Sequence, residues 1–321
     1  MKSIAQTLAA IGATGALCLT MPAQSQELRI GFITTLTGGG AFLGTQQQKG
    51  FMLGLEHEGW TKNGDKLGGV PTTLVVGDDK QQPQIGLEVA RKFIQSDRVH
   101  IISGIVWSNV MMAIQRSAFR AKRIIVSTNA GPSPLAGRSC SPYFISTSWN
   151  NDQQGESSGA LVQQDGAKNV FLVSANYQAG KDMLAGFQMG YKGKIAGRIL
   201  YKLGQTDFQA EITRIRAAKP DAVFVFAPGA MGIAFAKQWD AAGLGKTIKL
   251  YTLAVVDNAT LKAIGKSAVG SAHAIFWDHE GDFPGNKKFV KAFWAKHGQA
   301  PSYFAAQAYD APRLIAAAVR K

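Results

Sequence analysis

Cysteine is nearly absent from this sequence, whose 321 residues include only Cys18 and Cys140. Cys18 belongs to an N-terminal segment that we expect to be removed. The rest of the chain then keeps one cysteine, which cannot form an internal disulfide. A catalytic thiolate needs an activating base beside it. The loop-like run Arg138-Ser139-Cys140-Ser141-Pro142 instead favours an inert cysteine.

Acidic residues are scarce: 21 Asp and Glu stand against 35 Lys and Arg, which gives a formal net charge of +14. Such an excess is typical of proteins with nucleic-acid or anionic-surface partners. Here, however, the basic residues are scattered, and the longest runs are pairs such as Lys287-Lys288. We therefore expect a solvated basic surface and no nucleic-acid partner. With 46% hydrophobic and 17% charged residues, the chain is also too apolar to be disordered.

Long hydrophobic runs are absent beyond the N-terminus. Lys2 is followed by an apolar stretch, Ile4–Leu19, which Gly and Ala interrupt and which is too short to span a membrane. Ala23 and Ser25 then supply the small residues that signal peptidase reads. The N-terminus therefore predicts a cleaved signal peptide over residues 1–25 and a periplasmic location. Leu17 stands where a lipoprotein signal has a small residue, so we expect no lipid anchor.

The sequence contains no complete catalytic motif. The segment His57-Glu58-Gly59-Trp60-Thr61 lacks the second histidine of a zinc protease, and no Gly-x-Ser-x-Gly elbow occurs. The adjacent acids Asp78 and Asp79 fit solvated loop carboxylates better than an acid–base pair. We therefore expect a protein that is not an enzyme and that uses no cofactor and no metal.

Three fragments nevertheless resemble the short-chain dehydrogenases: a Gly-rich turn at 37–44, Asn129-Ala130-Gly131, and a Tyr-x-x-x-Lys formed by Tyr177 and Lys181. In that chemistry the lysine lowers the pKa of the tyrosine phenol. The match fails at Phe42, where that family has glycine, and at 179–180, where Ala-Gly predicts a loop rather than a helix. An oxidoreductase that uses Tyr177 and Lys181 remains the alternative of another class.

Short apolar runs alternate with amphipathic segments, which indicates an α/β fold with parallel sheets covered on both faces. The predicted strands are Leu28–Leu36, Thr72–Val76, Val99–Ser103, Arg123–Ser127, Tyr143–Ser146, Asn169–Ser174, Ala222–Phe226 and Ile248–Leu253. The predicted helices are Thr45–Glu58, Pro83–Gln95, Asn109–Arg120, Lys181–Tyr191, Phe208–Ala218, Met231–Ala242, Asn286–His297 and Tyr303–Arg320. The alternation breaks at 147–151 and at 271–278, which predicts two lobes joined by crossovers, with a hinge and a cleft.

Several segments resemble one family in their order and spacing. They are the Thr37-Gly38-Gly39-Gly40 turn, Asp78-Asp79, Ser103–Ser108, Asn129–Leu135, Asn176–Asp182 and Ala217–Val223. They are similar to the periplasmic substrate-binding proteins of branched-chain amino-acid-type ABC transporters, the Leu/Ile/Val-binding family with the type I periplasmic binding protein fold. The likeness is greatest to a subgroup that binds aromatic carboxylates. It implies two Rossmann-like lobes, residues 26–146 plus 278–321 and residues 147–277, with the ligand between them. Members of the family continue past the position of Lys321, so we expect their C-terminal closing segment to be absent here.

The resemblance also implies a set of ligand-binding residues. In lobe one these are Ser108, at the start of a helix that holds the ligand carboxylate, and Trp107, Asn129, Ala130, Gly131, Phe42 and Leu43. In lobe two they are Trp149, Asn150, Asp152 and Tyr177. Structural alternatives stay open: Ser108 as a plain helix N-cap, Gly131 as a turn glycine, and the aromatic residues as core.

The ligand class that we predict depends on an acidic residue that this sequence lacks. Amino-acid binders of this family hold the ligand ammonium with a carboxylate after the strand that matches Ile248–Leu253, but here no acid follows until Asp257. A buried ammonium without a carboxylate costs several kcal/mol. We therefore expect an aromatic carboxylate, benzoate- or cinnamate-like. A branched-chain amino acid or an aliphatic acid is the alternative, and Asp152 and Asp182 are the acids that would serve an ammonium. The implied partner is an inner-membrane ABC permease, and we expect a monomer.

Overall fold

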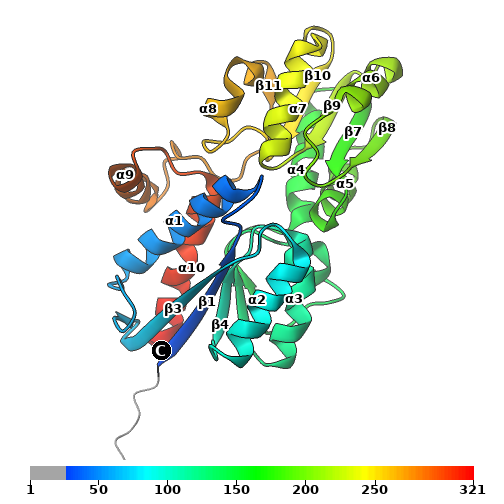
Figure 1. Ribbon diagram of the computed structural model, residues 1–321. Helices are drawn as coiled ribbons and strands as arrows, with labels where there is room; N and C mark the ends of the chain where they lie inside the picture. The colour runs from blue at the N-terminus through cyan, green and yellow to red at the C-terminus, as the bar shows by residue number, and fades with distance from the viewer. Residues whose placement is uncertain (1–26) are drawn as a thin grey trace, which may run out of the picture.

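The computed structural model describes residues 27–321 (Figure 1). The predicted signal peptide, residues 1–25, lies outside the described residues. The described chain forms two α/β lobes, each built around its own sheet, which confirms the predicted fold class. Within residues 27–321, no helix is both long and apolar enough to cross a bilayer.

The first sheet has six strands in the order β2-β3-β1-β4-β5-β6, all parallel except β2 against β3. The strands are β1 (Leu28–Thr34), β2 (Lys66–Leu67), β3 (Val70–Asp78), β4 (Ile101–Gly104), β5 (Ile124–Ser127) and β6 (Phe144–Ser146). Its helices are α1 (Ala41–His57), α2 (Pro83–Gln95), α3 (Ser108–Arg120), α9 (Asn286–His297) and α10 (Tyr303–Val319). Helices α1 and α10 pack on Ile30 and Phe32 of one face, and α2 and α3 pack on Ile33 and Ile102 of the other.

The second sheet has five parallel strands in the order β11-β10-β9-β7-β8. They are β7 (Asn169–Ala175), β8 (Lys194–Tyr201), β9 (Ala222–Phe226), β10 (Lys249–Leu253) and β11 (Ser271–Ala272). Its helices are α4 (Asn151–Gln164), α5 (Gln178–Gly190), α6 (Gln209–Ala218), α7 (Ala230–Ala241) and the short α8 (Leu261–Ile264). The central strand β9, AVFVF, is buried at every residue, as a continuous apolar run requires in a sheet covered on both faces.

The structure differs from the sequence-based prediction at several elements, among them β8 and α5. Strand β8 was not predicted, because its sequence KIAGRILY mixes charged, small and apolar residues, as suits a strand at the sheet edge. Helix α5 begins at Gln178, so the predicted loop at residues 179–180 is wrong and both residues lie in the first turn of the helix.

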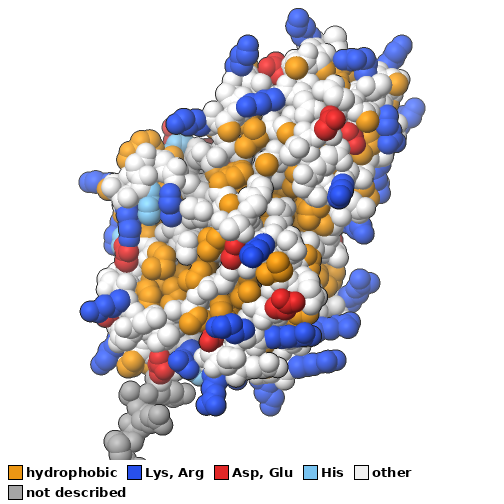
Figure 2. Space-filling view, viewed as in Figure 1, with side chains coloured by type: hydrophobic (Ala, Val, Ile, Leu, Met, Phe, Trp, Pro, Cys, Tyr) orange, Lys and Arg blue, Asp and Glu red, His pale blue; other side chains and the backbone are white. Residues whose placement is uncertain are grey.

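Within residues 27–321 the chain passes between the lobes at residues 147–150, which join β6 to α4, and at 273–285, which join β11 to α9. Figure 2 shows Lys and Arg side chains spread over both lobes on the visible face rather than gathered in one patch. Buried apolar side chains continue from lobe one into lobe two without interruption, so the lobes lie against each other.

Candidate functional site

A small cavity of about 30 Å³ lies between the lobes, at the carboxyl ends of strands from both sheets. From lobe one its walls are Val106, Trp107, Ser108, Asn129, Tyr303 and Phe304. From lobe two they are Asn151, Gln154, Tyr177, Ala179, Met183, Phe226, Pro228 and Ala254. Ligands of parallel α/β sheets bind outside these strand ends, where loops and helix N-termini meet. This interlobe cavity is therefore the candidate binding site.

The walls of the cavity carry no charged side chain and are rich in aromatic rings. The rings of Trp107 and Tyr177 meet edge to face, with centroids 6.0 Å apart, and Tyr177 stacks on Phe226 at 6.2 Å. Both are arrangements that aromatic quadrupoles favour. Such walls suit a flat apolar group better than a charged one.

The N-terminus of α3 supplies the polar end of the cavity. Trp107 is the N-cap residue and makes no side-chain cap, and Ser108 is the first residue of the helix. Ser108 is therefore not an N-cap, which removes that alternative. Its hydroxyl oxygen instead accepts a hydrogen bond from Asn151 Nδ2 of lobe two at 3.1 Å. An uncapped helix N-terminus favours a negative charge, and here the Ser108 hydroxyl and the Asn151 amide lie at that end.

Asn151 lies between the predicted residues Asn150 and Asp152, and of the three it is the one that lines the cavity. Its amide nitrogen also donates to Asp182 Oδ2 at 2.9 Å, and the same carboxylate accepts bonds from the Gln178 amide and the Ser133 N–H. A capping box of Asn150 and Gln153 fixes the start of α4 and thereby places Asn151 at the first helical position. The spacing Asn150-x-x-Gln153 is the sequence signal from which this placement follows.

The other predicted residues of lobe two lie around the cavity rather than in its walls. Asn150 caps α4, and Asp152 accepts a hydrogen bond from the Ser133 hydroxyl. Trp149 is 44% exposed and packs on Phe276, with ring centroids 5.4 Å apart. Of the predicted residues of lobe two, Tyr177 alone is part of the cavity wall.

In lobe one the predicted loop residues have mainly structural contacts. Asn129 lines the cavity, and its amide donates to the Val106 carbonyl at 2.7 Å. The Ala130 N–H donates to Ile105 O at 3.1 Å, and the Gly131 carbonyl accepts the Asn151 N–H at 2.8 Å.

Phe42 and Leu43 lie outside the cavity walls. A Cβ built on Gly229 of lobe two would lie 3.5 Å from Leu43 Cδ1 and 3.9 Å from Phe42 Cζ. The two side chains therefore border the loop before α7, elsewhere in the interface between the lobes.

A buried hydrogen-bond chain orients the indole of Trp107. Its Nε1–H donates to Thr35 Oγ1 at 2.8 Å, and the Thr35 hydroxyl donates to Asp79 Oδ1 at 2.6 Å. Asp79 is fully buried, so its prediction as a solvated carboxylate is wrong. Burial raises the pKa of Asp79, and the hydrogen bonds from Thr35 and the Gln81 N–H oppose that rise. At Gly40 a Cβ would lie 2.5 Å from Trp107 Cζ2, so only glycine admits the indole there.

Tyr177 has the wrong electrostatics for a catalytic phenol. Burial and the charge of Asp182 raise its pKa far above the usual value for tyrosine, whereas dehydrogenase chemistry requires that pKa to be lowered. The Lys181 side chain is exposed. This geometry argues against the oxidoreductase alternative.

Two α/β lobes that enclose a cavity at the carboxyl ends of their strands are the architecture of bilobed solute receptors. Residues 27–321 match the family model described as periplasmic binding protein, and the chain belongs to that family. The Leu/Ile/Val-binding protein homolog 6 of Brucella melitensis is 25% identical over 298 residues, which span 91% of this chain and 74% of that protein. The family is one of ABC transporter substrate-binding proteins, which implies a periplasmic location.

Solved structures agree with this assignment. An ABC transporter solute-binding protein from R. palustris in complex with benzoate superposes with a TM-score of 0.86 and 30% identity, over 92% of this chain and 81% of that one. A second from R. palustris, in complex with 4-hydroxybenzoate, has a TM-score of 0.84 and 27% identity over 92% and 81%. The LivJ protein of Streptococcus pneumoniae with isoleucine shares the fold, with a TM-score of 0.80 and 24% identity over 91% and 84%.

Proposed function

We propose that this protein binds an aromatic carboxylate, benzoate- or cinnamate-like, between its lobes and delivers it to an inner-membrane ABC permease. It acts as a monomer in the periplasm after loss of the signal peptide 1–25. Lobe one comprises residues 26–146 plus 278–321, and lobe two comprises residues 147–277. The observation that carries the proposal is the wall of the interlobe cavity, which has many aromatic side chains and no carboxylate.

The two ends of the cavity match the two ends of such a ligand. A carboxylate fits the N-terminus of α3, where the Ser108 hydroxyl and the Asn151 amide can donate hydrogen bonds to it. The ring fits between Trp107 and Tyr177, where each edge or offset contact is worth about 0.5–1.5 kcal/mol. The benzoate and hydroxybenzoate complexes of the R. palustris relatives support this choice.

An amino-acid ligand fits this wall less well. Its ammonium would need an acid, and Asp182, 7% exposed, already accepts three hydrogen bonds and does not line the cavity. Asp152 is bonded to Ser133 and lies outside the wall too. An unpaired ammonium in this cavity would cost several kcal/mol.

Binding requires the lobes to separate. A cavity of about 30 Å³ has room for about two water molecules rather than an aromatic ring. The ring therefore enters when lobe two moves and carries Asn151 and Tyr177 away from Ser108 and Trp107. Hinge motion of this kind is the usual response of bilobed receptors to ligands.

A thermal-shift screen of benzoates, cinnamates, fatty acids and amino acids tests the proposal. An aromatic acid should raise the melting temperature, because a ligand at about 100 times its Kd stabilises the folded state by about 2.7 kcal/mol. Leucine, valine and the fatty acids should have no such effect. Stabilisation by leucine or valine without any response to aromatic acids would overturn the proposal.

A further inference from the structure

Asp182 is a buried carboxylate that lies one side chain away from the interlobe cavity. It belongs to α5 of lobe two and does not line the cavity itself. Its Oδ1 accepts the Gln178 amide at 2.7 Å, and its Oδ2 accepts the Ser133 N–H at 3.1 Å and Asn151 Nδ2 at 2.9 Å. Of these three donors, Asn151 is the one that also lines the cavity.

The carboxylate determines which end of the Asn151 amide faces it. An ionised carboxylate only accepts hydrogen bonds, so the amide nitrogen must face Asp182 and the amide oxygen must not. The nitrogen carries two protons, one donated to Asp182 Oδ2 and the other to Ser108 Oγ at 3.1 Å. The reversed amide would place its oxygen against the carboxylate, where two acceptors repel each other.

The orientation of the Asn151 amide in turn sets the direction of the Ser108 hydroxyl. Because the hydroxyl oxygen accepts the Asn151 amide, its own proton points elsewhere, and it is donated to no residue within 27–321. This proton lies at the N-terminus of α3, where no side chain caps the backbone N–H groups. The polar end of the cavity therefore offers hydrogen-bond donors, which a carboxylate requires and the NH₂ group of a carboxamide does not match.

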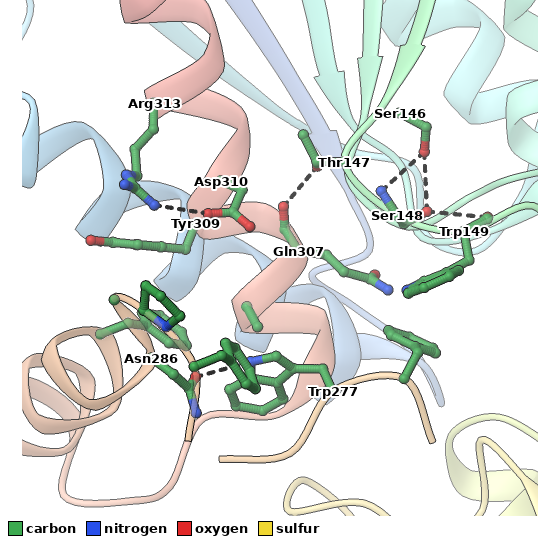
Figure 3. A pocket seen from close by; sticks show the side chains of 16 residues that line it. Ser146, Thr147, Ser148, Trp149, Trp277, Asn286, Gln307, Tyr309, Asp310 and Arg313 are labelled. Atoms are coloured by element: carbon green, nitrogen blue, oxygen red, sulfur yellow. Dashed lines mark hydrogen bonds and ion pairs between the residues drawn. The ribbon is translucent and has the colours of Figure 1, made fainter. Parts of the chain in front are cut away.

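The first crossover fixes the position from which Asn151 acts. Thr147 Oγ1 donates to the Gln307 carbonyl oxygen at 2.8 Å (Figure 3). The next residue, Ser148, donates through its hydroxyl to the Asn129 carbonyl oxygen at 2.8 Å. These contacts hold the segment that leads into α4. In the closed protein, the freedom left at Asn151 is therefore the orientation of its amide.

We propose that Asp182 makes the interlobe site selective for carboxylates over carboxamides, because it holds Asn151 and Ser108 in the orientation in which they donate. The inference rests on the proposed function and names the residue that discriminates between two ligand groups of the same shape. Asp182 is a positioning residue, since it acts through Asn151 and does not touch the ligand. Its negative charge alone would repel a ligand carboxylate, so orientation and charge predict opposite effects when that charge is removed.

Asp182→Asn is the variant that tests the proposal. It keeps the shape of the side chain, and its amide can donate to a reversed Asn151 amide, whose oxygen then accepts the Ser108 proton. The probes are two pairs, benzoate with benzamide and cinnamate with cinnamamide, titrated into the whole protein and followed by calorimetry. The wild type should prefer the acid of each pair. In Asp182→Asn this preference should fall about tenfold or more, through weaker binding of the acid and equal or stronger binding of the carboxamide.

Asp221→Asn is the matched control. Asp221 is also a carboxylate of lobe two, and it accepts the N–H groups of Lys168 and Asn169, both at 2.9 Å. It precedes β9, at the opposite end of the sheet from the cavity. Its variant should keep the wild-type preference for the acid.

An Asn151→Ala background shows whether Asp182 acts through the Asn151 amide. In that background Asp182→Asn should change the preference for the acid no further, because the amide that transmits its effect is gone. A further loss of preference of the same size as in the wild type would contradict the proposed route.

The remaining outcomes separate this inference from the proposed function. Tighter binding of the acid by Asp182→Asn, an unchanged preference, or an equal loss of both ligands of a pair would overturn the role of Asp182 alone. Binding of neither acid by the wild type would overturn the proposed function and this inference with it.

Nuclear magnetic resonance of the wild type decides the question if Asp182→Asn does not fold. The side-chain amide signal of Asn151, assigned by its absence from Asn151→Ala, should shift when the acid saturates the protein. A signal that stays in place would overturn the proposal.

Discussion

Ser108 and Asn151 lie at the starts of two helices, one in each lobe. Each is the first residue of a helix, α3 in lobe one and α4 in lobe two, and their side chains meet at 3.1 Å. A ligand carboxylate that binds between them replaces this neutral hydrogen bond with charge-assisted bonds, which are about twice as strong. The contact therefore holds the lobes together in the absence of a ligand. When a ligand binds, the Ser108 hydroxyl and the Asn151 amide donate to its carboxylate instead.

We predict that Ser108→Ala weakens the binding of an aromatic carboxylate by about 1.5–3 kcal/mol, the range for a hydrogen bond to a charged group. Isothermal calorimetry with benzoate measures it. Ser117→Ala, the same substitution near the other end of α3 and outside the cavity, is the matched control and should bind like the wild type. Equal affinity in the two variants would exclude a ligand role for the Ser108 hydroxyl.

The sequence predicts only part of the cavity wall, for physical reasons. Trp107, Ser108 and Asn129 directly follow strands, so a strand pattern is enough to place them at the sheet edge. Tyr303 and Phe304 start α10, which packs along α1, and no local pattern shows that a helix from the end of the chain reaches this cavity. Whether each predicted residue binds the ligand stays a prediction.

At the scale of elements, glycines bring α4 and α5 together. A Cβ on Gly155 would lie 2.2 Å from the Met183 carbonyl oxygen, and one on Gly159 would lie 2.1 Å from that of Phe187. From the other helix, Gly186 and Gly190 approach α4 equally closely. This spacing of four residues in each helix keeps the backbones in contact and holds Asn151 over Asp182. This close packing is not predicted from the sequence, because glycine contributes nothing to the hydrophobic periodicity of either helix.

We predict that Gly159→Ala destabilises the protein by about 1–3 kcal/mol, the usual cost of overpacking. At an exposed helical site the same change stabilises a protein by up to about 1 kcal/mol, because alanine has the higher helix propensity. A loss of stability in Gly159→Ala would therefore by itself indicate close packing between the two helices. Urea unfolding measures it, with Ser157→Ala on the exposed face of α4 as the control. A Gly159→Ala variant as stable as the wild type would show that α4 and α5 have room to separate.

For the whole molecule, Asp257 joins the two lobes. It follows β10, and its carboxylate accepts the Ala259 N–H at 2.7 Å and the Tyr303 N–H, at the start of α10, at 3.3 Å. Beside it, Asn258 Nδ2 donates to Pro301 O at 2.9 Å. Asp257, the first acid after the strand, is thus occupied with a helix N-terminus and does not line the interlobe cavity. No local pattern in the sequence indicates this long-range contact.

The titration of Asp257 gives the last prediction. Burial raises the pKa of this carboxyl from 3.8 to about 6, although the hydrogen bonds and His279 oppose the rise. Between these two pKa values the folded state holds a proton that the unfolded state has lost. The stability that Asp257 contributes is therefore complete below pH 4 and is lost as the pH rises through 6.

From pH 4 to pH 7 the free energy of unfolding of the wild type should fall by about 2–3 kcal/mol relative to that of Asp257→Asn, which cannot titrate. Urea unfolding at pH 4, 5, 6 and 7 measures the difference, with Glu156→Gln at an exposed site of α4 as a control of equal charge change. Parallel pH profiles for wild type and Asp257→Asn would contradict a buried carboxyl at the junction of the lobes.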